Sequence, residues 1–225
     1  MTTNPNWAEI KDNLLPGQTP QDRPDLTTRV FKQKKDQLIR DINNGKIFGD
    51  VVGYLWVVEF QKRGLPHAHI LIILDSKDIP KTAEQVDQIV CAELPPNPNE
   101  PGISEEEKAE RQPLWDIVIN NMIHGPCGDQ NKESPCMENG KCSKQFPKPF
   151  QKDTLMDEDR SYPVYRRRAP DDGGGRTVKN GKIIDNRWVV PYNAYLSLRY
   201  NCHINVEICI SPKAAKYLQI CDKRA

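Results

Sequence analysis

Two apolar segments flank a short polar stretch in the first third of the chain. Residues 54–60 read YLWVVEF and residues 70–74 read ILIIL, with QKRGLPHAH between them at positions 61–69. Runs of β-branched and aromatic residues bounded by turn residues are typical of strands, so this pattern predicts a β-hairpin. Because successive side chains of a strand point to opposite faces, His67 and His69 should share one face of the second strand.

The length of the hairpin loop decides which residues face the two histidines. A five-residue loop after Gln61 places Gln61 opposite His67 and Glu59 opposite His69, whereas a four-residue loop would place apolar residues there. Pro66 cannot donate a hydrogen bond to a strand ladder, which favours leaving it in the loop. We therefore predict a divalent-metal site of His67 and His69, with Gln61 as the third ligand and Glu59 as the alternative. By ligand type alone such a site suits Zn²⁺, Mn²⁺ or other divalent ions.

The same stretch resembles a known protein family. Residues 60–69, FQKRGLPHAH, are similar to the His-hydrophobic-His motif of HUH endonucleases, in the form carried by the replication-initiator-like domain of Helitron transposases. Further matches occur in order along almost the whole chain: NPNW at 4–7, HGPCG at 124–128, SPCM at 134–137, WVVPYN at 188–193, HINVE at 203–207 and KYL at 216–218. The resemblance implies an α+β fold with a central antiparallel sheet of ferredoxin-like or RNA-recognition-motif type, helices on one face and the metal on the other.

The resemblance also implies an activity: nicking and rejoining of single-stranded DNA at transposon ends, with Mg²⁺ or Mn²⁺ and a 5′-phosphotyrosine intermediate. Tyr217 matches the nucleophile of the family's Tyr-Leu-x-Lys-Tyr helix, with Lys216 and Lys223 as phosphate or phenolate partners. The second tyrosine of that motif is replaced by Cys221, and the usual lysine by Ile220. These replacements favour an alternative, a catalytically degenerate remnant that only binds nucleic acid.

Four potential metal ligands lie close together in a region rich in glycine and proline. His124, Cys127, Cys136 and Cys142 have the spacing H-x₂-C-x₈-C-x₅-C. Nitrogen and sulfur ligands in a segment with little core of its own predict a structural zinc site, and the alternative is a loop with unpaired thiols. Three further cysteines on apolar elements are expected in the core: Cys91, Cys202 and Cys209.

A formal net charge of +1 excludes a polybasic nucleic-acid binder, so any DNA contact must be local. The alternative for each basic group is a solvated surface charge. The candidate phosphate contacts are residues 32–35 together with Lys62, Arg63, Arg166, Arg167 and Arg168.

Periodicity and capping signals predict the remaining elements. Helices are expected over 24–43, 83–94 and 104–122, the last with a break or kink at Pro113, and a final helix from Ser211. Strands are expected over 188–190 and 203–210, where His203, Asn205 and Glu207 either line the site or are merely exposed. Residues 1–3 stand where Helitron-like domains carry a strand, so that strand is expected to be missing.

These elements suggest three regions. Residues 1–95 would form the first part of the core with the metal-binding hairpin, residues 96–186 an insertion that binds zinc, and residues 187–225 the closing strands and the tyrosine helix. Residues 171–175 should form a flexible tip of the insertion.

No run approaches the ~18 apolar residues of a membrane span, and no apolar leader precedes the polar start. We expect a soluble intracellular, nuclear protein whose cysteines are reduced. The helicase domain expected in a full-length relative is absent from these 225 residues.

Overall fold

The computed structural model describes residues 1–60, 64–157 and 160–210. Within these ranges the chain combines α-helices with three two-stranded antiparallel sheets, which confirms the α+β class. The helices are α1 (Ala8–Lys11), α2 (Pro24–Gly45), α3 (Ala83–Ile89), α4 (Glu105–Asn121) and α5 (Ala194–Tyr200). The sheets are β1 (Val51–Phe60) with β2 (Pro66–Leu74), β3 (Met137–Glu138) with β4 (Lys141–Cys142), and β5 (Arg176–Lys179) with β6 (Lys182–Asp185). No helix of the described residues is long and apolar enough to span a membrane.

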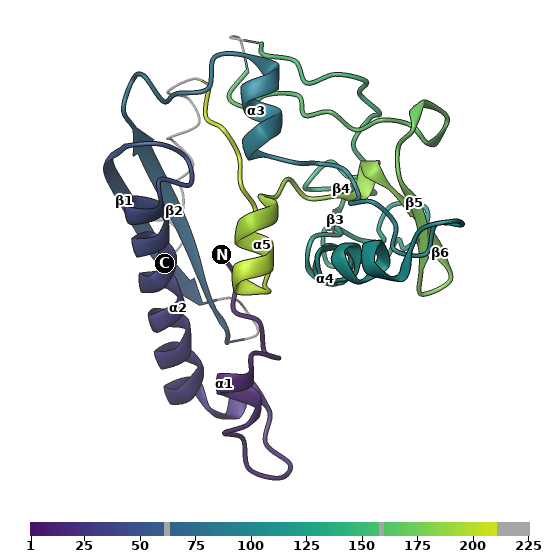
Figure 1. Cartoon of the computed structure of the whole chain (residues 1–225). Helices are drawn as coiled ribbons and strands as arrows, with labels where there is room; N and C mark the ends of the chain where they lie inside the picture. Colours follow the sequence, from purple (N-terminus) through teal and green to yellow (C-terminus); the bar gives the residue numbers. More distant parts are fainter. Residues whose placement is uncertain (61–63, 158–159, 211–225) are drawn as a thin grey trace.

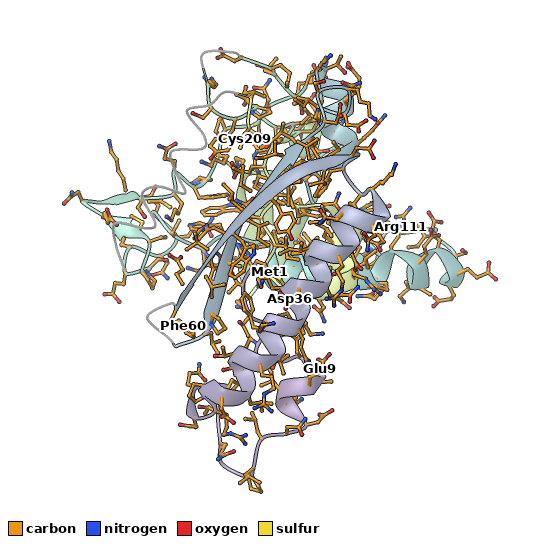
Figure 2. All side chains as sticks on the ribbon, turned by 90° about the vertical axis from the view of Figure 1, so that its left-hand side faces the viewer. Met1, Glu9, Asp36, Phe60, Arg111 and Cys209 are labelled. Atoms are coloured by element: carbon orange, nitrogen blue, oxygen red, sulfur yellow. The ribbon has the colours of Figure 1, made fainter. Side chains whose placement is uncertain are left out.

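Helix α2 and the β1–β2 hairpin form the first layer pair of the molecule. Pro24 occupies the first turn, and Val30, Phe31 and Leu38 are buried on the face turned to the sheet. The predicted helix is confirmed and ends at Gly45, with Lys46 in the left-handed conformation. Figure 1 shows α2 along the hairpin, and Figure 2, turned by 90°, shows it lying across the sheet with Phe60 at the end of β1.

The hairpin register differs from the predicted one by two residues. Glu59 pairs with His67 and Phe60 with Pro66, whereas we had expected Gln61 opposite His67 and Pro66 in the loop. Pro66 is accommodated as the first residue of β2, a strand position that needs no N–H donor. The predicted separation of faces is nevertheless confirmed, because a shift of two residues leaves each side chain on the same face.

Residues Met1, Thr2 and Thr3 extend the sheet along the other edge of β2. The Met1 nitrogen donates to the Ala68 carbonyl at 2.8 Å, and the Ala68 nitrogen donates back to the Met1 carbonyl at 2.8 Å. The Thr2 nitrogen donates to the His203 carbonyl at 2.9 Å on its other side. No regular strand is assigned to residues 1–3, and this edge of β2 carries a single bridge between Thr2 and His67.

The segment that follows α5 keeps the predicted alternation but is not a regular strand. Residues 203–210 carry no strand assignment, although Ile204 is buried and Asn205 and Glu207 are exposed. Cys202 is fully buried as predicted, Cys91 is partly buried, and Cys209 is exposed. The core prediction for Cys209 was therefore wrong.

Several elements after the hairpin differ from the predicted ones, in part because of contacts between residues distant in sequence. Helix α3 ends at Ile89 rather than Leu94, because Cys91 exchanges two backbone hydrogen bonds of 2.8 Å with Tyr192. The predicted strand at 188–190 is a 3₁₀ turn over Asn186–Trp188, followed by a single bridge between Val189 and Ile123. Helix α4 begins after the Ser104 cap and continues through Pro113 without the expected break.

The region 124–185 has a small apolar core and one unusually close backbone contact. Cys127, Cys142, Ile184 and Trp188 form a buried cluster. A Cβ on Gly174 would lie 2.0 Å from the Arg168 carbonyl oxygen. The expected flexible tip is therefore packed against the chain, and glycine is required there for the close approach.

A buried carboxylate joins three segments that are far apart in sequence. The Glu93 side chain is 6% exposed and accepts hydrogen bonds from Arg168 Nη2 at 2.6 Å and Asn186 Nδ2 at 3.1 Å. Arg166 Nε lies 3.3 Å away. Arg167 is itself buried and donates to the carbonyls of Ala92, Asn186 and Val189. We call these residues the Glu93 network: Glu93, Arg166, Arg167, Arg168 and Asn186.

Replacing Glu93 with glutamine should lower the free energy of unfolding by about 2–3 kcal/mol at neutral pH, because the buried side chain loses its charge-assisted hydrogen bonds with Arg166 and Arg168. Burial by itself would raise the pKa of Glu93, but hydrogen bonds from Arg168 outweigh it and the pKa is lowered. The ionised form therefore stabilises the fold above its unfolded pKa of about 4.3, and this contribution disappears as pH falls through the lower folded value.

Urea denaturation of both proteins across pH measures this difference. The gap between wild type and Glu93→Gln should be constant near neutrality and shrink below about pH 4. Glu100→Gln is the matched control, because Glu100 is an exposed partner of Arg111 and surface pairs contribute about 0–1 kcal/mol. Equal losses in the two variants would contradict a special role for Glu93.

Candidate metal centres

The hairpin brings one carboxylate and two imidazoles together near its loop end. Glu59, His67 and His69 each offer a ligand atom, and these atoms all lie within 4.8 Å of one another. His69 Nε2 is 3.0 Å from Glu59 Oε1, and the two imidazole rings are 4.7 Å apart between centroids. The alternative third ligand, Glu59, is thus at the predicted histidine pair, while the preferred one, Gln61, lies outside the described residues.

Thr2 fixes the orientation of the His67 ring. Thr2 Oγ1 is 2.6 Å from His67 Nδ1, across the bridge that pairs the two residues. When Nδ1–H donates to this hydroxyl, Nε2 carries the lone pair that a metal requires. Burial, together with the nearby Met1 amino group, His69 and His203, lowers the pKa of His67 to about 3. The imidazole is therefore neutral throughout the physiological range, as a ligand must be.

The donor set at the hairpin fits a divalent ion of intermediate hardness. Two imidazole nitrogens and a carboxylate oxygen are ligand types found in sites for divalent transition metals. The site is partly open, since the side chains of His69 and Glu59 are 23% and 46% exposed.

The second cluster consists of His124, Cys127, Cys136 and Cys142, as the sequence predicted. One ligand atom from each lies within 4.8 Å of the other three, and Cys142 Sγ is 3.3 Å from His124 Nε2. Sulfur ligands of a tetrahedral zinc at 2.3 Å are about 3.8 Å apart, so the cluster has a suitable size. Cys127 and Cys142 are buried and the other two are partly buried. This His/Cys₃ cluster can hold a metal such as zinc.

Local structure explains how these four residues converge. The bridge between Ile123 and Val189 and the bond from the His124 nitrogen to the Trp188 carbonyl hold the first ligand. The β3–β4 hairpin opposes Met137 to Cys142 and so places Cys142 beside Cys136. Phe146 stacks on the His124 ring at 4.3 Å between centroids.

The protonation pattern of the cluster favours a cation. Burial, and then hydrogen bonds with Cys142 and Cys136, raise the pKa of Cys127 to about 12. Burial also opposes ionisation of Cys142, but backbone donors from Phe146 and Lys144 outweigh it and its pKa is lowered. Cys142 therefore ionises more readily than Cys127, and a bound cation would favour the thiolate form of both. Burial, and then Lys144 and Lys148, lower the pKa of His124, which keeps it neutral.

A short chain of contacts links the two clusters. His67 bonds Thr2, the Thr2 nitrogen donates to the His203 carbonyl, and His203 Nδ1 lies 2.7 Å from the Asn121 carbonyl at the end of α4. Asn121 is three residues before His124. The backbone around His203 therefore lies between the two centres, and neither Thr2 nor this connection had a signal in the sequence.

The predicted phosphate contacts have different environments. Arg167 is buried and bonded to three carbonyls, so it does not face solvent, while the Arg166 and Arg168 side chains are 38% and 40% exposed beside Glu93. In the 32–35 region, Lys32 and Lys35 pair with Asp36, and Lys34 pairs with Glu9. The remaining predicted contacts and catalytic residues lie outside the described residues: Lys62, Arg63, Lys216, Tyr217 and Lys223.

Comparison with known proteins supports the resemblance in the first third of the chain. Residues 1–72 match the family model described as Helitron helicase-like domain at N-terminus. This range contains α1, α2, β1 and most of β2, including both histidines of the hairpin site. The predicted Helitron relationship is confirmed for this segment. No curated protein matches the chain.

Substitution of cluster cysteines should remove tightly bound metal. We expect one zinc per chain in the purified protein by elemental mass spectrometry, and loss of that zinc in Cys127→Ser and Cys142→Ser. Zinc added to metal-free protein should release protons, because the raised pKa of Cys127 keeps this thiol protonated at neutral pH.

The matched control is Cys209→Ser, because Cys209 is exposed and outside the cluster. Its zinc content should equal that of the wild type. Full zinc content in both cluster variants would rule out the His/Cys₃ site.

Proposed function

We propose that this chain is a Helitron-type endonuclease domain that nicks and rejoins single-stranded DNA at transposon ends. The observation that carries the proposal is the hairpin site of Glu59, His67 and His69, which lies within the segment that matches the Helitron family. Mg²⁺ or Mn²⁺ is the proposed ion, with Gln61 as a further ligand candidate. Such an ion would polarise the scissile phosphate and neutralise charge in the transition state.

The protein residues have separate roles in this proposal. The Tyr217 phenol oxygen attacks the phosphorus, the bond between phosphorus and the 3′ oxygen breaks, and the phenolic proton ends on that 3′ oxygen, which leaves as a 3′ hydroxyl. The product is a 5′-phosphotyrosine, and reversal with another 3′ hydroxyl rejoins the strand. Lys216 and Lys223 would balance the charge of the phenolate or phosphate, and Lys62, Arg63, Arg166 and Arg168 would contact the DNA backbone.

The arrangement of the described residues supports the proposed division of the chain. Apolar residues from α2, β2 and α5 share one core, which supports grouping the first region, residues 1–95, with the described residues that follow 187. A structural zinc at His124, Cys127, Cys136 and Cys142 would organise the insertion, residues 96–186. A helicase partner and a nuclear location complete the proposal.

A second candidate is a remnant that binds nucleic acid without cutting it. Cys221 stands where the family has its second tyrosine, and a thiolate is a poor replacement for attack on a phosphodiester. This candidate predicts salt-sensitive retention of single-stranded DNA that needs no divalent ion.

Covalent capture separates the two candidates. Incubation with end-labelled single-stranded DNA and Mn²⁺ should give a protein–DNA adduct that survives denaturing electrophoresis. Tyr217→Phe and His67→Ala should each abolish it, since one lacks the nucleophile and the other a metal ligand.

Tyr195→Phe is the control, because Tyr195 is an exposed tyrosine on α5 outside both clusters. It should form the adduct at the wild-type level. An adduct that persists in both Tyr217→Phe and His67→Ala would end the endonuclease assignment.

A further inference from the structure

Lysine and phenylalanine side chains are interspersed in the segment around and after Cys142, the last ligand of the His/Cys₃ cluster. Residues 139–152 read NGKCSKQFPKPFQK and contain four lysines, two phenylalanines and no acidic residue. Lys141, Lys144 and Lys152 are exposed, and Lys148 is partly buried. We call this segment the lysine–phenylalanine strip.

Contacts with the cluster and with Arg187 hold the aromatic rings of the strip. Phe146 stacks on His124, and Lys148 Nζ lies 5.1 Å from the Phe146 ring centroid. Phe150 is 37% exposed, and the Arg187 guanidinium carbon lies 4.6 Å from its ring centroid. The Lys148 nitrogen donates to the Arg187 carbonyl, which fixes the strip to the turn before Val189. The strip therefore presents an ordered ring beside a guanidinium.

The lysines of the strip differ from most basic groups elsewhere on the surface. In the described part of the chain, no carboxylate lies within 4.0 Å of Lys141, Lys144, Lys148 or Lys152. By contrast, Lys32, Lys34, Lys35, Lys46, Lys77 and Arg111 all have acidic partners at the surface. A row of lysines without ion pairs attracts polyanions, because bound phosphates release counterions.

We infer that the lysine–phenylalanine strip binds single-stranded DNA, with lysines on the phosphates and Phe150 stacking on an unpaired base. Grooves that combine positive charge with exposed aromatic rings are the usual means of binding single strands, and paired bases of a duplex do not offer their faces to such a ring. The hydrogen bonds that run from His67 through Thr2 and His203 to Asn121 connect the hairpin site with the His/Cys₃ cluster, next to which the strip lies. The inference rests on the proposed function, because the strand bound here is taken to be the substrate of the proposed endonuclease.

Anisotropy titration of a fluorescein-labelled oligothymidylate over a series of salt concentrations tests this inference. The full-length, zinc-containing Tyr217→Phe protein is used without Mg²⁺ or Mn²⁺, so that binding is measured independently of cleavage. Adding Lys144→Ala and Lys152→Ala should reduce the slope of log K against log salt by about 1.4, since each single-strand phosphate contact contributes about 0.7. Adding Phe150→Leu instead should weaken binding about tenfold with little change in slope.

The control for charge is the pair Lys11→Ala and Arg29→Ala, two exposed basic residues of α1 and α2, which lie far from β3 and β4 in Figure 1. This pair removes the same net charge and should leave the slope nearly unchanged. Zinc content and unfolding temperature of every variant must match the parent.

Equal slopes for the strip and control variants, or equal affinity for a duplex of the same length, would overturn the inference. Because the assay contains no cleavage step, a missing covalent adduct would refute the proposed function without affecting this result. Conversely, adduct formation with unchanged binding of the strip variants would refute only the strip.

Discussion

The buried carboxylate of Glu93 is the interaction on which the second half of the molecule depends. An unpaired charge in a protein interior is very costly, so Glu93 must keep its partners, and these come from residues 166–168 and 186. The Tyr192 hydroxyl also donates to the Glu93 backbone carbonyl. The strands β3 to β6 of this region are only two to four residues long. The Glu93 network, rather than extensive strand pairing, therefore holds its segments together.

Arg167 illustrates the same principle with the opposite charge. Its guanidinium donates to three carbonyls rather than to a carboxylate, and burial lowers its pKa to about 10. It remains protonated at neutral pH and supplies a donor to each of these carbonyls, of which the Asn186 carbonyl also accepts from the Val189 nitrogen at 3.4 Å. The turn before Val189, which positions both His124 and Lys148 by backbone hydrogen bonds, is thus held by an arginine from another segment.

Local signals predicted much of the fold, and long-range contacts account for what they missed. The helix from Pro24 and the division of the hairpin into two faces follow from apolar periodicity, which depends only on neighbouring residues. The spacing of His124 and the three cysteines likewise predicted a cluster that the structure brings together. The end of α3 could not be predicted from neighbouring residues, because it is set by backbone hydrogen bonds between Cys91 and Tyr192, about a hundred residues away. Similarly, the sequence does not distinguish the three consecutive arginines at 166–168. In the structure Arg166 and Arg168 pair with Glu93 and are partly exposed, whereas Arg167 is buried.

The chemistry of the two centres makes them suited to different roles. Thiolate ligands of the buried His/Cys₃ cluster prefer zinc and would exchange it slowly, whereas imidazole and carboxylate at an open hairpin suit a more readily exchanged ion. A metal that replaces a hydrophobic core must stay bound, and a metal that assists a reaction must leave coordination positions for the substrate. Thr2 and His203 lie between the centres, so a metal bound at the His/Cys₃ cluster would also constrain the backbone that orients His67. The hairpin site therefore depends on more than its own ligands: its geometry is supported through the sheet edge by the part of the chain that the Glu93 network and the cysteine cluster hold in place.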